Sequence, residues 1–308
     1  MQVALDEDRG VRFRVKADSR FRVVRQFGSR SVLRFPCCAA RNVLSEAGMT
    51  FPIHVSGFLI DLDGTVMEAQ SLVPEVPQAL ALLRDRNLPY RLVTNTTSKP
   101  RSAILSKMRS LGLDLPPDAI ITAPLIAREY LLQHGLTRCY PLLKDSLRED
   151  LQDIEFVDRS PQAVLVGDLG DELSYGALNR GFRFLLDKKV AFVTLARNRY
   201  FRGSDGLCLD VGATVAALEY AAARTAVLIG KPAREFFLIA CQSMGVAPEE
   251  TIVIGDDLEA DVGGALAAGC AGVLVRTGKF RPEQLENPVV RPDRILDSLA
   301  CLPDLLSS

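Results

Sequence analysis

Histidine is scarce in this sequence, because only two occur among 308 residues, His54 and His134. A zinc site built on several histidines is therefore nearly excluded. A Ser-His-Asp triad would have to use one of the two. His54 lies just before the first predicted strand and His134 near the end of a predicted helix, so we expect neither to be catalytic.

Long hydrophobic runs and paired cysteines are also missing. No apolar stretch reaches the roughly 18 residues that a membrane span needs. The net charge of −1 gives no field that would favour nucleic acid or an anionic membrane as a partner. The seven cysteines include no C-x-x-C pair. This pattern favours buried free thiols in a reducing compartment, and hence a cytoplasmic protein.

The N-terminal segment differs in charge from the rest of the chain. Up to residue 48 it holds nine arginines and one lysine against five acids, a net charge of +5. It lacks the apolar core of a secretory signal, and three consecutive acids at 6–8 argue against an organellar transit peptide. Residues 1–50 are therefore predicted to be a basic, disordered extension, or translated sequence ahead of a true start at Met49.

Strands and helices alternate from residue 57 onward. GFLID (57–61) is a continuous apolar run, as expected of a parallel strand covered on both faces. Further strands are predicted at 88–95, 225–230, 250–257 and 271–278, and helices at 73–87, 98–112 (with Ser98 as its cap), 231–245 and 260–269. This alternation predicts an α/β fold with a parallel sheet.

A middle block of about 90 residues has its own alternation. Strands at 163–168 and 189–196 are separated by a helix at 172–187. We therefore predict a smaller α/β domain inserted into the first one. The predicted division is 51–123 plus 212–308 for the core and 124–211 for the inserted domain.

Polar side chains follow four of the predicted strands. They are Asp61 and Asp63, then Thr94 and Asn95, then Lys231, and finally Asp256 and Asp257, with Asp261 in the first turn of the next helix. Ligands of an open α/β sheet bind beyond the carboxyl ends of its strands. We therefore expect these side chains to share one crevice.

The residue types in this crevice favour phosphoryl chemistry. Asp61 and Asp256 would repel each other without a cation, and oxygen ligands suit Mg²⁺, which is often shared with substrate phosphate. Lys231 adds a compact positive charge. The two-residue spacing puts Asp61 and Asp63 on the same side of an extended chain. One carboxylate can then attack phosphorus while the other shuttles a proton.

Four segments together resemble one family. DLDGT (61–65), LVTN (92–95), GKP (230–232) and GDDLEAD (255–261) look like the motifs of haloacid dehalogenase superfamily phosphatases, of the subclass IIA with an α/β C2-type cap. LDVGATVAALEYA (209–221), GKPAREFF (230–237), GDDLEADVGGA (255–265) and VRTGKFRP (275–282) are similar to the phospholysine phosphohistidine inorganic pyrophosphate phosphatase group. The resemblance spans about residues 55–305.

This resemblance implies a Rossmann-like core with an inserted cap and a magnesium-dependent phosphatase. Its substrate would be a small phosphorylated compound, with pyrophosphate and phosphoramidates as inherited expectations. The resemblance assigns Asp61 as nucleophile, Asp63 as general acid/base and Lys231 as the cation that stabilises nucleophile and phosphate. The reaction would pass through an aspartyl-phosphate, and a homodimer through the cap is a further expectation.

The same resemblance implies the metal and phosphate contacts. Asp61, Asp256 and the backbone carbonyl of Asp63 would bind Mg²⁺, and Thr94 and Asn95 would contact phosphate. Asp261 would orient Lys231 or the water molecules bound to the metal. Asp257 would either bind the metal directly or orient the groups that bind it.

One segment departs from the family pattern. Many capped relatives have a TNPD-like segment after the last cap strand, whereas this chain reads TLARNRYFRGSDG (194–206). Arg197, Arg199 and Arg202 are candidates to bind a second anionic group of the substrate, with a solvated basic loop as the favoured alternative.

Other interpretations are weaker or stay open. GVLVRTGKF (272–280) fails as a P-loop, because it has one residue too many between its glycines and Phe280 in place of Ser or Thr. No G-x-G-x-x-G follows the first strand, which argues against a dinucleotide site. A phosphoryl-transfer mutase of the same fold and a catalytically silent scaffold remain alternatives.

Overall fold

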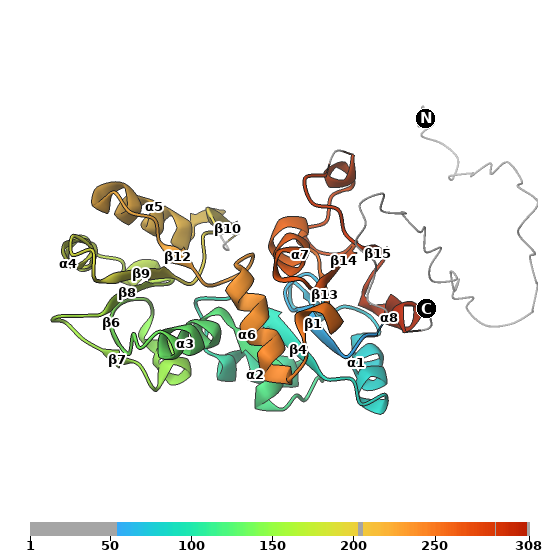
Figure 1. Cartoon of the computed structure of the whole chain (residues 1–308). Helices are drawn as coiled ribbons and strands as arrows, with labels where there is room; N and C mark the ends of the chain where they lie inside the picture. The colour runs from blue at the N-terminus through green and yellow to red at the C-terminus, as the bar shows by residue number, and fades with distance from the viewer. Residues whose placement is uncertain (1–53, 203–205, 287, 307–308) are drawn as a thin grey trace, which may run out of the picture. The chain divides into compact units, whose positions relative to one another are not determined.

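The computed structural model of the chain describes residues 54–202, 206–286 and 288–306. The predicted extension at 1–50 lies outside these residues. Two parallel sheets with flanking helices make up the described part (Figure 1). The predicted α/β fold is therefore confirmed.

The larger sheet has six strands in the order β15-β14-β13-β1-β4-β5, and every pairing in it is parallel. Its strands are β1 (Gly57–Asp61), β4 (Tyr90–Thr94), β5 (Ile120–Thr122), β13 (Thr251–Gly255), β14 (Ala271–Val275) and β15 (Arg294–Leu296). Strands β1, β13 and β14 are buried at every position, as parallel strands covered on both faces should be.

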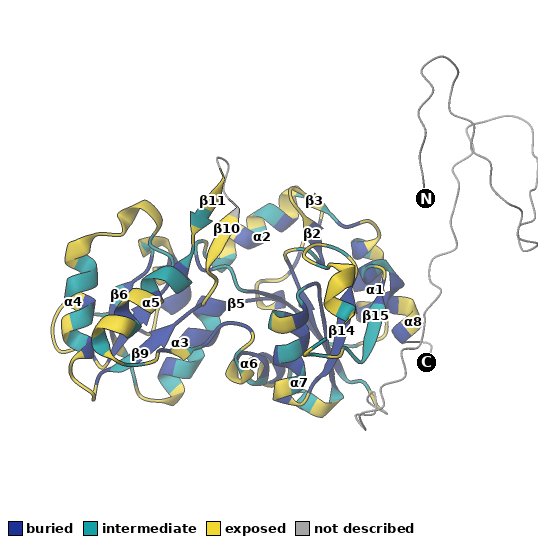
Figure 2. Ribbon diagram, turned by 90° about the horizontal axis from the view of Figure 1, so that it is seen from above, coloured by how far each residue is buried: buried dark blue, intermediate teal, exposed yellow. Residues whose placement is uncertain are grey.

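Helices cover both faces of this sheet (Figure 2). They are α1 (Val76–Asp85), α2 (Arg101–Ser110), α3 (Ala123–Gln133), α6 (Arg234–Met244), α7 (Gly264–Ala268) and α8 (Leu302–Leu305). Successive side chains of β1 point to opposite faces. Phe58 and Ile60 therefore pack in one core with Leu80 of α1, while Leu59 packs in another with Phe236 of α6.

The second sheet has five strands in the order β12-β9-β8-β6-β7, again all parallel. Its strands are β6 (Arg138–Leu142), β7 (Glu155–Phe156), β8 (Ala163–Val166), β9 (Ala191–Thr194) and β12 (Val227–Leu228), and its helices are α4 (Tyr175–Leu185) and α5 (Val211–Ala222). Two hairpins complete the strands, β2 (Met67–Glu68) with β3 (Ser71–Leu72) and β10 (Tyr200–Arg202) with β11 (Leu207–Leu209).

Within the described residues, the helices of other types are a π-helix, η5 (Leu258–Gly263), and six 3₁₀ helices. The latter are η1 (Pro117–Ala119), η2 (Asp145–Leu151), η3 (Gly170–Glu172), η4 (Pro248–Glu250), η6 (Pro282–Leu285) and η7 (Leu299–Cys301). The helix predicted at 260–269 therefore starts earlier, as η5, and continues as α7.

The predicted end of the inserted domain at residue 211 is too early. Strand β12 pairs with β9 of the second sheet, although the sequence placed it in the core sheet. Helix α5 packs on α4, with Val215 and Leu218 in the same hydrophobic cluster as Leu185 and Phe192. The inserted segment therefore runs through Leu228, because a short apolar strand carries no signal of which sheet it joins.

Ser98 does not cap α2, contrary to the prediction. The helix begins at Arg101, Pro100 occupies its N-cap position, and no side chain caps it. A proline disfavours helical backbone in the residue before it. Ser98 and Lys99 therefore lie outside the helix and remain free to line the cavity described below.

The predicted free thiols are only partly confirmed. Cys139, Cys241 and Cys270 are buried and free, whereas Cys208 is free but partly exposed. Cys301 is buried as well. Cys37 and Cys38 lie outside the described residues. Among the helices that the structure describes, none combines the length and the apolar character needed to cross a membrane.

Candidate active site

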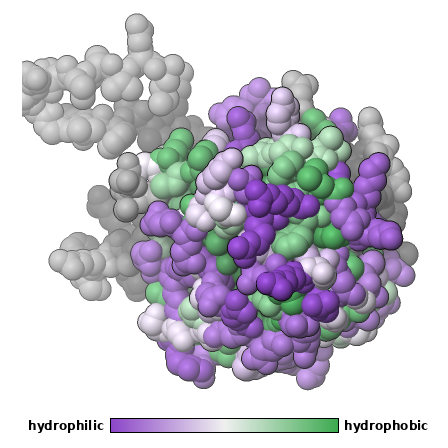
Figure 3. Space-filling view, turned by 90° about the vertical axis from the view of Figure 1, so that its left-hand side faces the viewer, coloured by the Kyte–Doolittle hydropathy of each residue, from purple (hydrophilic) through white to green (hydrophobic). Residues whose placement is uncertain are grey.

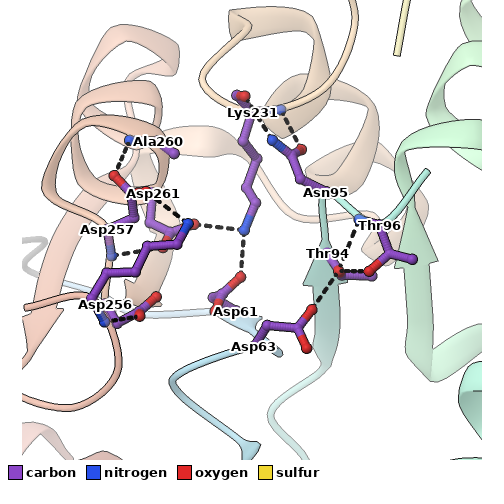
Figure 4. A network of polar contacts seen from close by, with 11 residues as sticks. Asp61, Asp63, Thr94, Asn95, Thr96, Lys231, Asp256, Asp257, Ala260 and Asp261 are labelled. Atoms are coloured by element: carbon purple, nitrogen blue, oxygen red, sulfur yellow. Dashed lines mark hydrogen bonds and ion pairs between the residues drawn. The ribbon is translucent and has the colours of Figure 1, made fainter. Parts of the chain in front are cut away.

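A polar cluster forms where strands of the core sheet end (Figure 4). Asp61 is the last residue of β1, Thr94 is the last residue of β4, and Asp256 directly follows β13. Lys231 comes instead from the segment between β12 and α6. These side chains therefore lie close together, as predicted. Lys231, however, follows β12, which belongs to the second sheet.

The Lys231 ammonium lies between two carboxylates. Its Nζ donates to Asp61 Oδ1 at 2.5 Å and to Asp261 Oδ1 at 2.6 Å, and the side chain is only 4% exposed. Burial alone would lower the pKa of Lys231, but the charges of Asp261 and Asp61 outweigh it and raise the pKa above its usual value. The lysine therefore stays charged.

Asn95 holds the main chain of Lys231 in place. Its Nδ2 donates to the Lys231 carbonyl at 2.9 Å, and its Oδ1 accepts from the Lys231 N–H at 2.8 Å. Both ends of the amide are thus engaged. Asn95 also lines the cavity described below, and its predicted contact with phosphate stays a prediction.

Asp63 and Thr94 form a second polar contact in the same cavity. The Thr94 hydroxyl donates to Asp63 Oδ2 at 3.1 Å, and Thr94 Oγ1 accepts from the Thr96 N–H at 3.1 Å. Asp63 is exposed, whereas Asp61, two residues earlier, is 5% exposed. The two carboxylates therefore have different surroundings, one dry and one open to water.

Three buried carboxylates lie close together. Oxygen atoms of Asp61, Asp256 and Asp261 all lie within 4.8 Å of one another. Burial is the largest cause that raises the pKa of Asp61, against the opposing charge of Lys231. Burial likewise raises the pKa of Asp256 to about 6, although an N–H of Lys279 opposes it. The protein alone therefore leaves Asp61 and Asp256 poorly compensated.

The hydrogen bonds indicate which of these acids fit a cation. Asp61 Oδ2 is buried and has no hydrogen-bond partner. Both oxygens of Asp261 are engaged, one by Lys231 and the other by the Asp257 N–H at 3.1 Å. Asp61 and Asp256 thus fit a hard cation such as Mg²⁺, which prefers oxygen ligands. Asp261 orients Lys231.

Asp257 caps a helix and forms an ion pair. Its Oδ1 accepts the N–H groups of Glu259 and Ala260 and caps η5, and its Oδ2 pairs with Lys279 Nζ at 3.0 Å. Burial alone would raise the pKa of Asp257, but these hydrogen bonds and the lysine charge lower it. Asp257 therefore lies beside the acid cluster rather than within it.

The cluster opens into a cavity of about 580 Å³. Four of its lining residues come from the inserted segment: Asp168, Asn198, Phe201 and Asp210. None of these was predicted. The core contributes two further lysines that were not predicted, Lys99 and Lys279. Lys279 lies in the VRTGKFRP segment (275–282), whose family resemblance could have indicated a residue near the site.

The predicted substrate-binding arginines lie elsewhere. Neither Arg197 nor Arg199 lines this cavity. Arg197 pairs with Glu219 of α5 and donates to the Ala226 carbonyl at 3.4 Å. Its guanidinium thus ties the β9–β10 segment to α5, a contact between residues 22 positions apart that the sequence does not reveal.

Comparison with known proteins agrees with this architecture. The haloacid dehalogenase-like hydrolase family matches residues 58–157, and the related HAD-hydrolase-like family matches residues 228–302. The human phospholysine phosphohistidine inorganic pyrophosphate phosphatase is 35% identical over 257 residues, which are 82% of this chain and 94% of the relative.

Solved structures show the same fold. A 4-nitrophenylphosphatase from Thermotoga maritima superposes with a TM-score of 0.75 at 28% identity, covering 81% of this chain and 97% of that one. NagD from E. coli K-12 has a TM-score of 0.75 at 23% identity, covering 80% and 98%.

The chain belongs to the haloacid dehalogenase-like hydrolases and has the NagD-type fold of subclass IIA. It is thus an enzyme of the hydrolase class, as the sequence motifs predicted. The human relative and the Thermotoga maritima protein are named as phosphatases.

Proposed function

We propose that this protein is a magnesium-dependent phosphatase that works through an aspartyl-phosphate on Asp61. The observation that carries the proposal is the buried chain of Asp61, Lys231 and Asp261 beside Asp256, with one oxygen of Asp61 left without a protein partner. A buried carboxylate without a full set of partners is costly, so a role in binding and catalysis explains its presence.

The first step is attack on phosphorus by the Asp61 carboxylate. A bond forms between an Asp61 oxygen and phosphorus, and the bond from phosphorus to the leaving oxygen breaks. Lys231 holds Asp61 in place and offsets the charge that gathers there. Asp63, exposed to the cavity, donates its proton to the leaving oxygen.

The second step is hydrolysis of the aspartyl-phosphate. Water attacks phosphorus, Asp63 takes a proton from that water, and the bond from phosphorus to Asp61 breaks. Inorganic phosphate leaves, and Asp61 is again a carboxylate. The Thr94 hydroxyl orients Asp63 for both proton transfers through its 3.1 Å hydrogen bond.

Asp61 and Asp256 would hold Mg²⁺, with the backbone carbonyl of Asp63 as a further proposed ligand. When bound, the ion supplies positive charge that offsets the phosphate oxygens during transfer. Asp261 acts on this site indirectly, because it fixes the ammonium of Lys231.

The proposed substrate is a small phosphorylated compound, with pyrophosphate and phosphoramidates in the set to test. The support for the latter is the name of the human relative at 35% identity. The support for a small substrate is the 580 Å³ cavity, which the inserted segment partly walls with Asn198 and Phe201.

Asp61→Asn tests the proposal directly. We expect purified wild-type protein to hydrolyse 4-nitrophenyl phosphate only with Mg²⁺ present, and Asp61→Asn to lose at least about 10³-fold in rate, because the amide is a poor nucleophile. A rate unchanged by Asp61→Asn, or equal with and without metal, would refute the proposal and favour the silent scaffold or another site.

A further inference from the structure

The turn that follows β14 lies against the loop at residues 62–66, which directly follows the proposed nucleophile Asp61. This turn comprises Thr277, Gly278 and Lys279, and we refer to it as the 277–279 turn. The Thr277 hydroxyl donates to the Gly64 carbonyl at 2.5 Å, and the Gly278 N–H donates to Glu68 Oε1 at 2.7 Å. Glu68 belongs to β2 of the short hairpin just after that loop. Two hydrogen bonds thus join segments more than 200 residues apart.

The same turn contacts both acids that follow β13. The Lys279 N–H donates to Asp256 Oδ2 at 2.6 Å, and Lys279 Nζ pairs with Asp257 Oδ2 at 3.0 Å. Asp256 is only 1% exposed. One of its oxygens is thus fixed by a main-chain donor that no side-chain substitution other than proline removes.

Gly278 lets the turn approach this closely. Its φ is +56°, in the left-handed region that favours glycine. A Cβ at this position would overlap Asp256 Oδ2 and would lie 2.6 Å from the Cα of Gly64. The turn therefore packs directly against both Asp256 and Gly64, with no side chain of its own at the contact.

We propose that the 277–279 turn positions the metal site, and that Thr277 and Glu68 are the side chains through which it does so. Asp61 and Asp256 come from different strands, and a cation shared by both requires a fixed distance between them. The turn holds the Asp61 loop through Thr277 and Glu68 and holds Asp256 through its main chain. Groups that orient metal ligands in this way commonly change metal affinity by about 10- to 100-fold.

This inference rests on the proposed function, since it assumes that Asp61 and Asp256 bind Mg²⁺. Thr277 and Glu68 are positioning residues: neither lines the cavity. Their loss is expected to weaken Mg²⁺ binding more than it slows turnover at saturating Mg²⁺.

Matched variants test the inference at each residue. Thr277→Val removes the hydroxyl and keeps the shape, whereas Thr277→Ser keeps the donor. Glu68→Ala removes the acceptor, whereas Glu68→Gln keeps an acceptor and removes the charge. Mg²⁺ binding to the full chain, stripped with chelator, is measured by titration calorimetry. We expect Thr277→Val and Glu68→Ala to raise the Kd for Mg²⁺ by about 10-fold, and Thr277→Ser and Glu68→Gln to stay within about two-fold of wild type.

A second readout separates positioning from general damage. In Mg²⁺ titrations of 4-nitrophenyl phosphate hydrolysis, both disrupting variants should approach the wild-type kcat at saturating Mg²⁺. Glu68 is exposed, so its replacement leaves the core intact, and melting curves check the Thr277 variants.

Equal Mg²⁺ affinity in wild type, Thr277→Val and Glu68→Ala would overturn the inference and leave the proposed function standing. Failure of wild type itself to bind Mg²⁺ would overturn the proposed function, and this inference with it.

Discussion

At the scale of single residues, the site depends on a contrast between two aspartates that lie two positions apart at the end of β1. Asp61 is buried against Lys231, and Asp63 is exposed to the cavity and bonded to Thr94. The sequence predicted both residues, because a D-x-D at a strand end is a local pattern, whereas the assignment of a role to each came from the family resemblance. Their different burial depends on tertiary packing, which the local pattern does not contain.

The buried acids make a prediction about stability. Burial raises the pKa of Asp256 from its ordinary value of 3.8 to about 6, so the metal-free fold loses stability between these two pH values and carries the full cost of the charge above about pH 6. We expect Asp256→Asn to raise the midpoint of thermal unfolding relative to wild type at pH 7.5 in chelator. The difference should shrink as the pH falls from about 6 to about 3.8, because Asp256 is neutral in folded wild type below 6 and in the unfolded chain only below 3.8.

Mg²⁺ should reverse this order. A ligand that binds only the folded state stabilises it, by about 2.7 kcal/mol at 100 times its Kd. Wild type should therefore gain stability with Mg²⁺, and Asp256→Asn should gain much less. Scanning calorimetry at pH 7.5 and at a pH below 6, with and without Mg²⁺, measures these differences. The account would be contradicted if metal-free Asp256→Asn melted below metal-free wild type at pH 7.5.

At the scale of elements, the sequence predicted whether a segment is a helix or a strand better than it predicted which sheet a strand joins. The continuous apolar runs of β1, β13 and β14 gave the core sheet, since burial on both faces leaves a clear pattern. The two residues of β12 are too short for such a pattern. Their pairing with β9 depends on contacts that are distant in sequence, so the insertion boundary was misplaced.

The cavity wall supplied by the inserted segment shows the same limit. Arg197 and Arg199 were predicted at the site from charge alone, and Arg197 pairs with Glu219 instead. Asn198 and Phe201, close by in the chain, line the cavity. Charge marks a residue as a candidate, but the direction of each side chain is set by the local turn and the hairpin of β10 and β11.

At the scale of the whole molecule, the homodimer through the inserted domain stays a prediction. Several large hydrophobic side chains of that segment are exposed, namely Tyr175, Leu186, Leu207, Leu209 and Tyr220. Figure 3 looks onto this side of the molecule and shows hydrophobic side chains gathered among hydrophilic ones. Exposed patches of this kind often mark association surfaces.

Light scattering after size exclusion tests the dimer. Wild type should have twice the chain mass of 33.7 kDa, and the double variant Leu209→Glu, Tyr220→Glu should have the single mass, because buried charge opposes association. A wild-type protein that stays at 33.7 kDa at tens of micromolar concentration would contradict the prediction.

Trapping the covalent intermediate tests the central claim most directly. Asp63→Asn can still accept a phosphoryl group on Asp61, but it lacks the base that activates water. After brief reaction with 4-nitrophenyl phosphate and Mg²⁺, acid quench and peptide mass mapping, we expect one hydroxylamine-labile phosphoryl group on the peptide that contains Asp61. The account would be contradicted if Asp63→Asn turned over at the wild-type rate. It would also be contradicted if the phosphoryl group were found on another residue and were still found in the Asp61→Asn, Asp63→Asn double variant.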